Sequence, residues 1–93
     1  MTKAEFIEKY RTVRASLYKT KNEGTVQIDV DTANEIRNLS KQDLLDMGWD
    51  EIQADYYLKS FVALNNLVPE YLAWRNALDT LTAEVETICD IMV

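Results

Sequence analysis

Side chains that can bind a phosphate group occur together in the first third of the chain. Arg11, Arg14 and Tyr18 are separated by three and four residues, which places them on one face of a helix. Two guanidinium groups beside an aromatic ring can hold a phosphate while the ring stacks on a base. The same spacing also gives an ordinary Arg–Tyr contact on a helix surface. Two interpretations therefore stay open, a nucleotide or phosphate site and simple helix packing.

A second group of residues combines carboxylates with aromatic rings in the middle third of the chain. The residues that we expect to contact a partner are Asp43, Asp46, Trp49, Asp50, Glu51, Asp55 and Tyr56. An acidic surface with aromatic anchors suits docking onto a basic site of another protein, including a site that normally holds nucleic acid. The alternative is a solvated acidic face that only keeps the protein soluble.

The commonest general base and the commonest transition-metal ligand, histidine, is missing from the chain. It contains no histidine, and Cys89 is its single cysteine, so an internal disulfide or a structural zinc site is excluded. Two glycines, Gly24 and Gly48, are too few for a glycine-rich phosphate loop. Cys89 lies on an apolar helix beside Asp90, which favours a buried, inert thiol. We expect a protein that is not an enzyme and that uses no cofactor and no metal.

Length and composition predict one small helical domain spanning residues 1–93. The chain is 47% hydrophobic and has two glycines and one proline, too few turn formers for a sandwich or a barrel. No apolar run reaches the roughly 20 residues that span a membrane. A cytoplasmic location is expected, because the lone cysteine suits a reducing compartment.

The net charge of −6 is unevenly distributed. Residues 1–23 hold six basic and three acidic side chains, a balance of +3, whereas residues 24–93 hold four basic and thirteen acidic ones, a balance of −9. The first helix is therefore basic and the remainder is acidic, so attraction within the chain or between copies is available.

Capping patterns predict where the helices begin. Thr2 and Glu5 form the first pattern, Ser40 and Asp43 the second, and Asp50 and Gln53 the third, while Asp31 is expected to cap a short helix before residue 40. Gly24 should end the first helix, and Val68–Pro69 should separate the last two.

Apolar side chains recur at helical spacing on the first and last helices. We expect the stripe Phe6, Tyr10, Val13 and Leu17 and the stripe Tyr71, Trp74, Leu78, Leu81, Val85, Ile88 and Met92 to face the core of an antiparallel bundle. The helix from Asp50 to about Leu67 is apolar nearly all round, which predicts either a central position or a partner on its second side.

One stretch of the sequence has the alternation of a β-strand. Val26, Ile28 and Val30 alternate with polar residues, and no second run of this kind exists to pair with them. The segment is an extended connector, a strand that pairs with its own copy, or an edge that adds to a sheet in another protein. The residues of this predicted edge are Thr25, Val26, Gln27, Ile28, Asp29 and Val30.

The segment Leu45-Asp46-Met47-Gly48-Trp49 resembles the Met-Gly-aromatic loop that joins short helices in ubiquitin-associated domains. The resemblance covers these five residues, and a helix stop followed by a hydrophobic staple explains the same residues. We therefore assign no family from the sequence.

The sequence favours a small acidic protein that binds a basic surface of another protein and modulates it. An inhibitor or antagonist, such as a phage-encoded protein that mimics DNA, fits this description. The first alternative is a structural homo-oligomer, such as a homodimer, that pairs through residues 25–30 and its helices. The second is a phosphate or nucleotide binder that uses Arg11, Arg14 and Tyr18. Direct binding of nucleic acid is not expected, because an acidic surface repels a polyanion.

Overall fold

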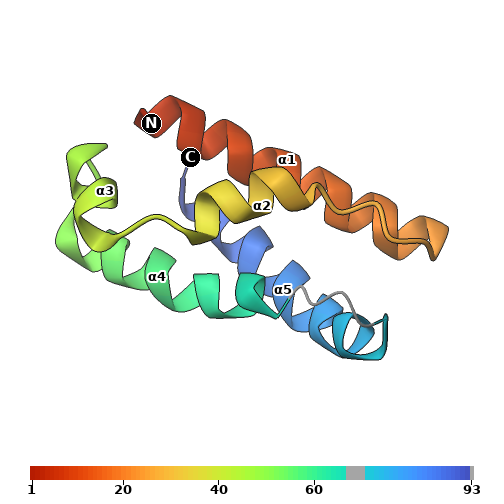
Figure 1. Ribbon diagram of the computed structural model, residues 1–93. Helices are drawn as coiled ribbons and strands as arrows, with labels where there is room; N and C mark the ends of the chain where they lie inside the picture. The colour runs from red at the N-terminus through yellow and green to blue at the C-terminus, as the bar shows by residue number, and fades with distance from the viewer. Residues whose placement is uncertain (67–70, 93) are drawn as a thin grey trace.

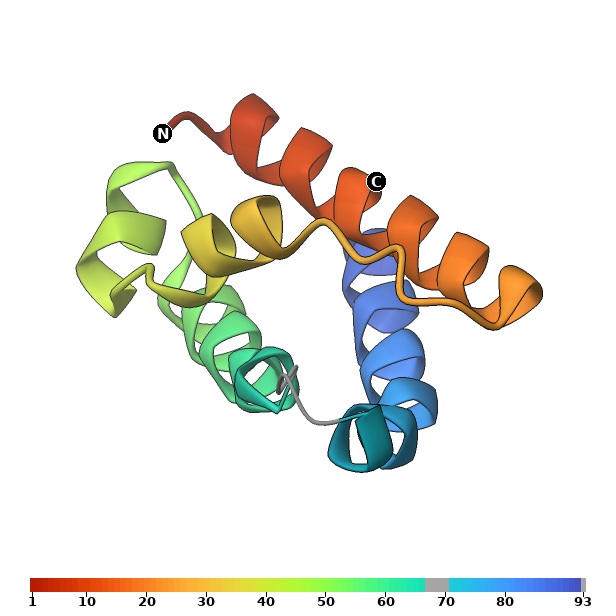
Figure 2. The ribbon, with the colours of Figure 1, turned by 45° about the vertical axis from the view of Figure 1, so that its right-hand side comes forward.

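A computed structural model describes residues 1–66 and 71–92, with the backbone alone for residues 71–74, and these residues contain five helices and no strand (Figure 1). The helices are α1 (Lys3–Glu23), α2 (Val30–Arg37), α3 (Lys41–Asp46), α4 (Glu51–Asn65) and α5 (Tyr71–Ile91). α1 packs against α2 and α5, and α4 packs against α2, α3 and α5. In Figure 2, α1 and α2 lie at the top of the molecule and α4 and α5 extend below them. The predicted small helical bundle is confirmed.

The predicted capping residues begin three of the helices. The Thr2 hydroxyl accepts the backbone N–H of Glu5 at 3.2 Å, and complete capping boxes start α3 at Ser40 and α4 at Asp50. α1 ends at Gly24, whose φ of 71° is left-handed and whose N–H donates to the Thr20 carbonyl at 2.9 Å.

The predicted apolar stripes form the core between the helices. Phe6, Tyr10, Val13 and Leu17 of α1 are fully buried, as are Leu81, Val85 and Ile88 of α5, and Cys89 is buried beside them. Burial raises the pKa of the Cys89 thiol, as expected for an inert thiol. The side chains of Tyr71 and Trp74, and the predicted boundary at Val68–Pro69, lie outside the described residues.

Of the three alternatives for residues 25–30, the structure shows the extended connector, and Val30, predicted as part of a strand edge, belongs to α2 instead. Residues 24–29 are an irregular connector, and Val30 is already the first residue of α2. Of the three alternating apolar side chains only Ile28 is buried, whereas Val26 and Val30 are 55% and 50% exposed. The three alternating side chains therefore do not form one buried face. The helix α2 begins at Val30, so this side chain does not continue the pattern started by Ile28.

The connector is attached to α1 by the side chain of Thr20. The backbone N–H of Gln27 donates to the Thr20 hydroxyl at 2.9 Å, and that hydroxyl in turn donates to the Ser16 carbonyl at 2.8 Å. Thr20 is buried. This contact, rather than a β-ladder, satisfies a backbone group of the extended segment.

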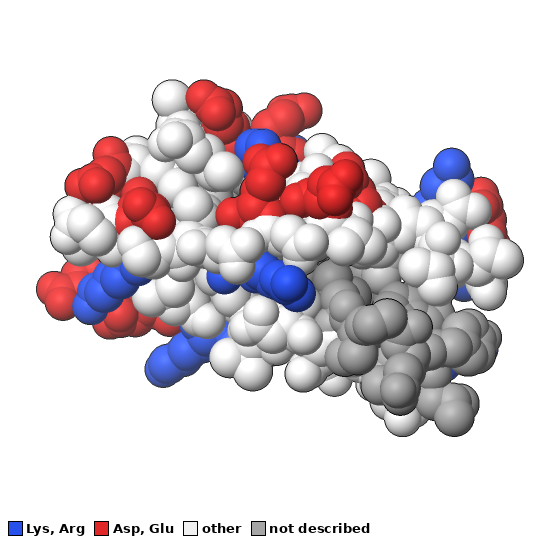
Figure 3. All heavy atoms as spheres, viewed as in Figure 1, with Lys and Arg blue, Asp and Glu red and all other residues white. Residues whose placement is uncertain are grey.

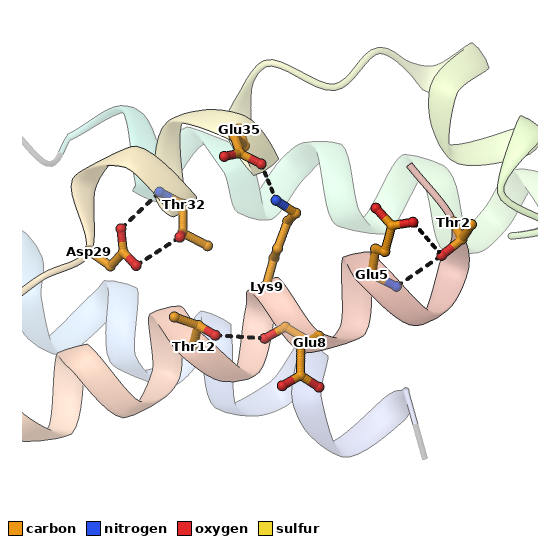
Figure 4. A network of polar contacts seen from close by, with 8 residues as sticks. All are labelled: Thr2, Glu5, Glu8, Lys9, Thr12, Asp29, Thr32 and Glu35. Atoms are coloured by element: carbon orange, nitrogen blue, oxygen red, sulfur yellow. Dashed lines mark hydrogen bonds and ion pairs between the residues drawn. The ribbon is translucent and has the colours of Figure 1, made fainter.

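The helix cap predicted at Asp31 is instead formed by Asp29. One Asp29 carboxylate oxygen accepts the backbone N–H of Thr32 at 3.0 Å and the other accepts its hydroxyl at 2.8 Å (Figure 4). These hydrogen bonds lower the pKa of Asp29. Asp31 then lies in the first turn of α2, where the positive end of the helix dipole stabilises its carboxylate.

Replacing Thr20 with valine should loosen the connector, because valine keeps the shape but removes both hydrogen bonds. We expect Thr20→Val to lower the free energy of unfolding by about 1–3 kcal/mol. The matched control is Thr12→Val on the exposed side of α1, which loses a single bond to the Glu8 carbonyl and should change stability by less than about 0.5 kcal/mol. Urea denaturation measures both, and equal losses would contradict the role assigned to Thr20.

Candidate protein-interaction surface

The structure brings the predicted carboxylates together where α3 is followed by α4. Figure 3 shows acidic side chains over α2 and around α3. The exposed acids of this junction are Asp43, Asp46, Asp50, Glu51 and Asp55. The Lys41 ammonium lies 3.0 Å from carboxylate oxygens of both Glu51 and Asp55, which raises its pKa and links α3 to α4. The five acids outnumber Lys41 and Lys3, the lysines beside them, so the junction is negative.

Several of these carboxylates have a structural role in the helices themselves. Asp43 accepts the backbone N–H of Ser40 at 2.9 Å, Asp50 accepts that of Gln53 at 2.8 Å, and Asp46 accepts the Gln42 amide at 2.8 Å. The bonds from the Ser40 backbone and hydroxyl lower the pKa of Asp43. The primary role of Asp43 and Asp50 is therefore to cap the starts of α3 and α4. Among the acids of the junction, Glu51 and Asp55 make side-chain ion pairs with Lys41 instead.

Trp49 cannot serve as the exposed aromatic anchor that the sequence predicts. It is 4% exposed, and its ring lies 4.9 Å from the Tyr57 ring and 5.8 Å from the Phe6 ring between centroids. The Lys3 ammonium covers it 4.1 Å from the ring centroid. Trp49 is a core residue, and of the two predicted aromatic contacts only Tyr56 is exposed.

Two exposed aliphatic side chains of α4 were missed as site residues by sequence reasoning. Ile52 is 83% exposed and Val62 is 62% exposed, and they lie near the predicted contact Tyr56, which is 36% exposed. Together with Asp55 and Lys59 they form what we call the outer face of α4, directed away from the buried Tyr57 and Phe61. The signal for this face was the apolar character of α4 on both sides.

The outer face of α4 continues into a groove between α4 and α5. The groove encloses about 510 Å³, and its lining includes Lys59, Val62 and Ala63 of α4 and Ala77, Thr80 and Glu84 of α5. Its walls combine small apolar and polar side chains with one charge of each sign.

The predicted phosphate residues lie together on α1. The Arg14 guanidinium lies 5.7 Å from the centroid of the Tyr18 ring, which is the ordinary helix-surface contact expected as the alternative interpretation. Arg14 also lies near the Cys89 thiol of α5, and its charge lowers the pKa of that thiol against the larger effect of burial. Arg14 and Tyr18 are half-buried and Arg11 is exposed.

Lysines of the basic first helix reach carboxylates on other helices. Lys9 pairs with Glu35 of α2 (Figure 4), and the Lys21 ammonium lies 3.9 Å from Asp79 of α5. The charge asymmetry of the sequence is therefore used in part within the chain. Exposed pairs of this kind contribute at most about 1 kcal/mol each.

Within the described part of the chain, no cluster of acidic or cysteine side chains could hold a metal ion. No described helix is long and apolar enough to cross a membrane. Comparison of the chain with family models, with curated proteins and with solved structures found no match.

The capping box at Ser40 predicts an acid-sensitive contribution to stability. Because the folded pKa of Asp43 is lowered, this contribution is present above the ordinary aspartate pKa of about 3.9 and is lost as the pH falls through the folded value. Side-chain carboxyl NMR should give a pKa for Asp43 below that ordinary value. Ser40→Ala should raise it, and Asp43→Asn should flatten the acid limb of the stability curve. An ordinary pKa for Asp43 would contradict the box.

Proposed function

We propose that this protein is a non-enzymatic binding module that contacts another protein through the outer face of α4. The observation that carries the proposal is the exposure of Ile52 and Val62 on a helix whose opposite side is fully packed. Covering a large aliphatic side chain on binding contributes about 1.5–3 kcal/mol. Three large apolar side chains on one helix face are what a protein interface core requires.

The charges near this face indicate a partner with a basic surface. Glu51 and Asp55 lie at the start of α4, beside the exposed Ile52 and Tyr56. Carboxylates at the rim of an apolar contact attract a positively charged partner over long range and disfavour acidic ones. The net charge of −6 adds to this attraction.

We favour one form of this function, an inhibitor or antagonist that occupies a basic, nucleic-acid-binding site of its partner. The apolar face would supply affinity at the centre of such a contact, and the carboxylates of the α3–α4 junction would stand where phosphates normally bind. The negative charge of the junction and the exposure of the apolar face support this form.

The partner can be identified by photo-cross-linking from the proposed face. A photoreactive amino acid in place of Ile52 should form an adduct in cells that express the chain natively, whereas the same group in place of the exposed Thr87 of α5 should not. The captured protein is then purified for affinity measurements, because capture alone does not establish a specific contact.

The affinity of the purified partner tests the outer face directly. Ile52→Asp should weaken binding by at least about tenfold, because it places a charge at the centre of the contact. The matched control is Val26→Asp, which makes the same kind of change at an exposed apolar residue of the connector and should leave the affinity within about twofold. Calorimetric titration measures both. Unchanged binding by Ile52→Asp with a loss in Val26→Asp would move the contact to the connector.

A further inference from the structure

We propose that the outer face of α4 pairs with the same face of a second copy of this chain, with the two helices antiparallel. The inference rests on the proposed function, since it names a second copy as an occupant of the same surface. It follows from the order of apolar and charged side chains along α4.

The face has the spacing of a helix-pairing seam. Ile52, Asp55, Lys59 and Val62 follow one another at intervals of three, four and three residues, so at 100° per residue they lie within about 80° of arc. The buried residues Ala54, Tyr57, Phe61 and Leu64 occupy the opposite side of the helix. The seam is therefore available to another helix without any change in the core.

The positions along the seam match when two copies are related by a two-fold axis on the outer side of α4, level with Tyr57 along the helix. Ile52 and Val62 each lie five residues from Tyr57, and Asp55 and Lys59 each lie two residues from it. In an antiparallel pair, Ile52 of one copy faces Val62 of the other, and Asp55 faces Lys59. The symmetry makes each of these contacts twice.

Charge selects the antiparallel orientation over the parallel one. Parallel helices would place Asp55 against Asp55 and Lys59 against Lys59, whereas antiparallel helices place opposite charges together. Among the described residues, no carboxylate lies within 4 Å of the Lys59 ammonium. Asp55 can turn to the second copy because Lys41, which it contacts, also pairs with Glu51.

The groove between α4 and α5 gives the second copy a place to insert. Val62, Lys59 and Ala63 form the α4 wall of the groove, so an Ile52 side chain that faces Val62 from the second copy meets the groove at its mouth. Ile52 is the most exposed large apolar side chain of the described residues. Self-pairing covers this side chain, and a partner protein that binds the same face must therefore compete with the second copy.

Sedimentation analysis from micromolar to millimolar concentrations tests this pairing. The monomer has a mass of 10.8 kDa, and wild-type protein should approach twice that value as the concentration rises. Asp55→Lys makes all four central charges of the pair positive, and Lys59→Asp makes them all negative. Each variant alone should lose at least about tenfold in its association constant, because like charges then face each other. An equimolar mixture of the two variants should recover the dimer, because opposite charges again meet.

Two variants with the same changes of charge away from this face serve as controls. Asp90→Lys on α5 and Lys19→Asp on α1 are both at exposed positions and should dimerise as the wild type does. Helical circular dichroism of all the variants shows that they are folded. Failure of the mixture to recover the dimer would overturn the charge register, and so would dimerisation of the single variants at wild-type strength.

The outcomes separate this inference from the proposed function. A wild-type protein that stays monomeric at millimolar concentration overturns self-pairing, while the loss of partner affinity in Ile52→Asp would still support the function. A dimer that obeys the charge pattern supports self-pairing even if Ile52→Asp binds a captured partner normally, in which case the proposed contact with another protein is overturned.

Discussion

The packing of aromatic rings between α1 and α4 decides which side of α4 faces inward. The Phe6 ring lies 5.0 Å from Tyr10 and 5.3 Å from Tyr57, and Trp49 closes the group against both Phe6 and Tyr57. These rings are almost completely buried although the Trp49 indole N–H and the Tyr57 hydroxyl have no hydrogen-bond partner among the described residues. Burial, with a smaller effect of the Asp50 carboxylate, raises the pKa of Tyr57 to about 12. With Tyr57 and Phe61 inside, Ile52 and Val62 lie on the outer side of α4.

The acidic character of the α3–α4 junction has two separate physical causes. Asp43 and Asp50 are present because helices begin there and their carboxylates accept backbone N–H groups. Glu51 and Asp55 have no such role, and their pairing with Lys41 is exposed to solvent. The proposed contact with a basic partner therefore depends on Glu51 and Asp55. A substitution of Asp43 would remove a helix cap as well as a charge, so it would not test recognition by itself.

Local patterns predicted most of the helical fold, because periodicity and capping act over a few residues. The buried stripe from Phe6 to Leu17 and the boxes at Ser40 and Asp50 follow directly from spacing. Alternation at Val26, Ile28 and Val30 left a strand and a connector open, because a strand needs a partner that the pattern itself does not supply, and the structure shows the connector. Trp49 was assigned to the contact surface, although a residue that precedes a helix cap can either pack on the core as a hydrophobic staple or face solvent. Its contacts with Phe6 and Tyr57, which the sequence does not reveal, place it in the core. The exposure of Ile52 was likewise not predictable, since α4 is apolar on both sides and the rest of the fold selects the inner one.

We propose that the protein makes its contacts through the outer face of α4. The most direct measurement is a backbone amide NMR map of the free protein, followed over a dilution series and then during addition of its purified partner. We expect the amides of residues 52–62 and those lining the groove at Ala77 and Thr80 to shift or broaden, while those of residues 11–18 and 25–30 stay unchanged. Changes concentrated at residues 25–30 or 11–18, with α4 unaffected, would contradict this proposal.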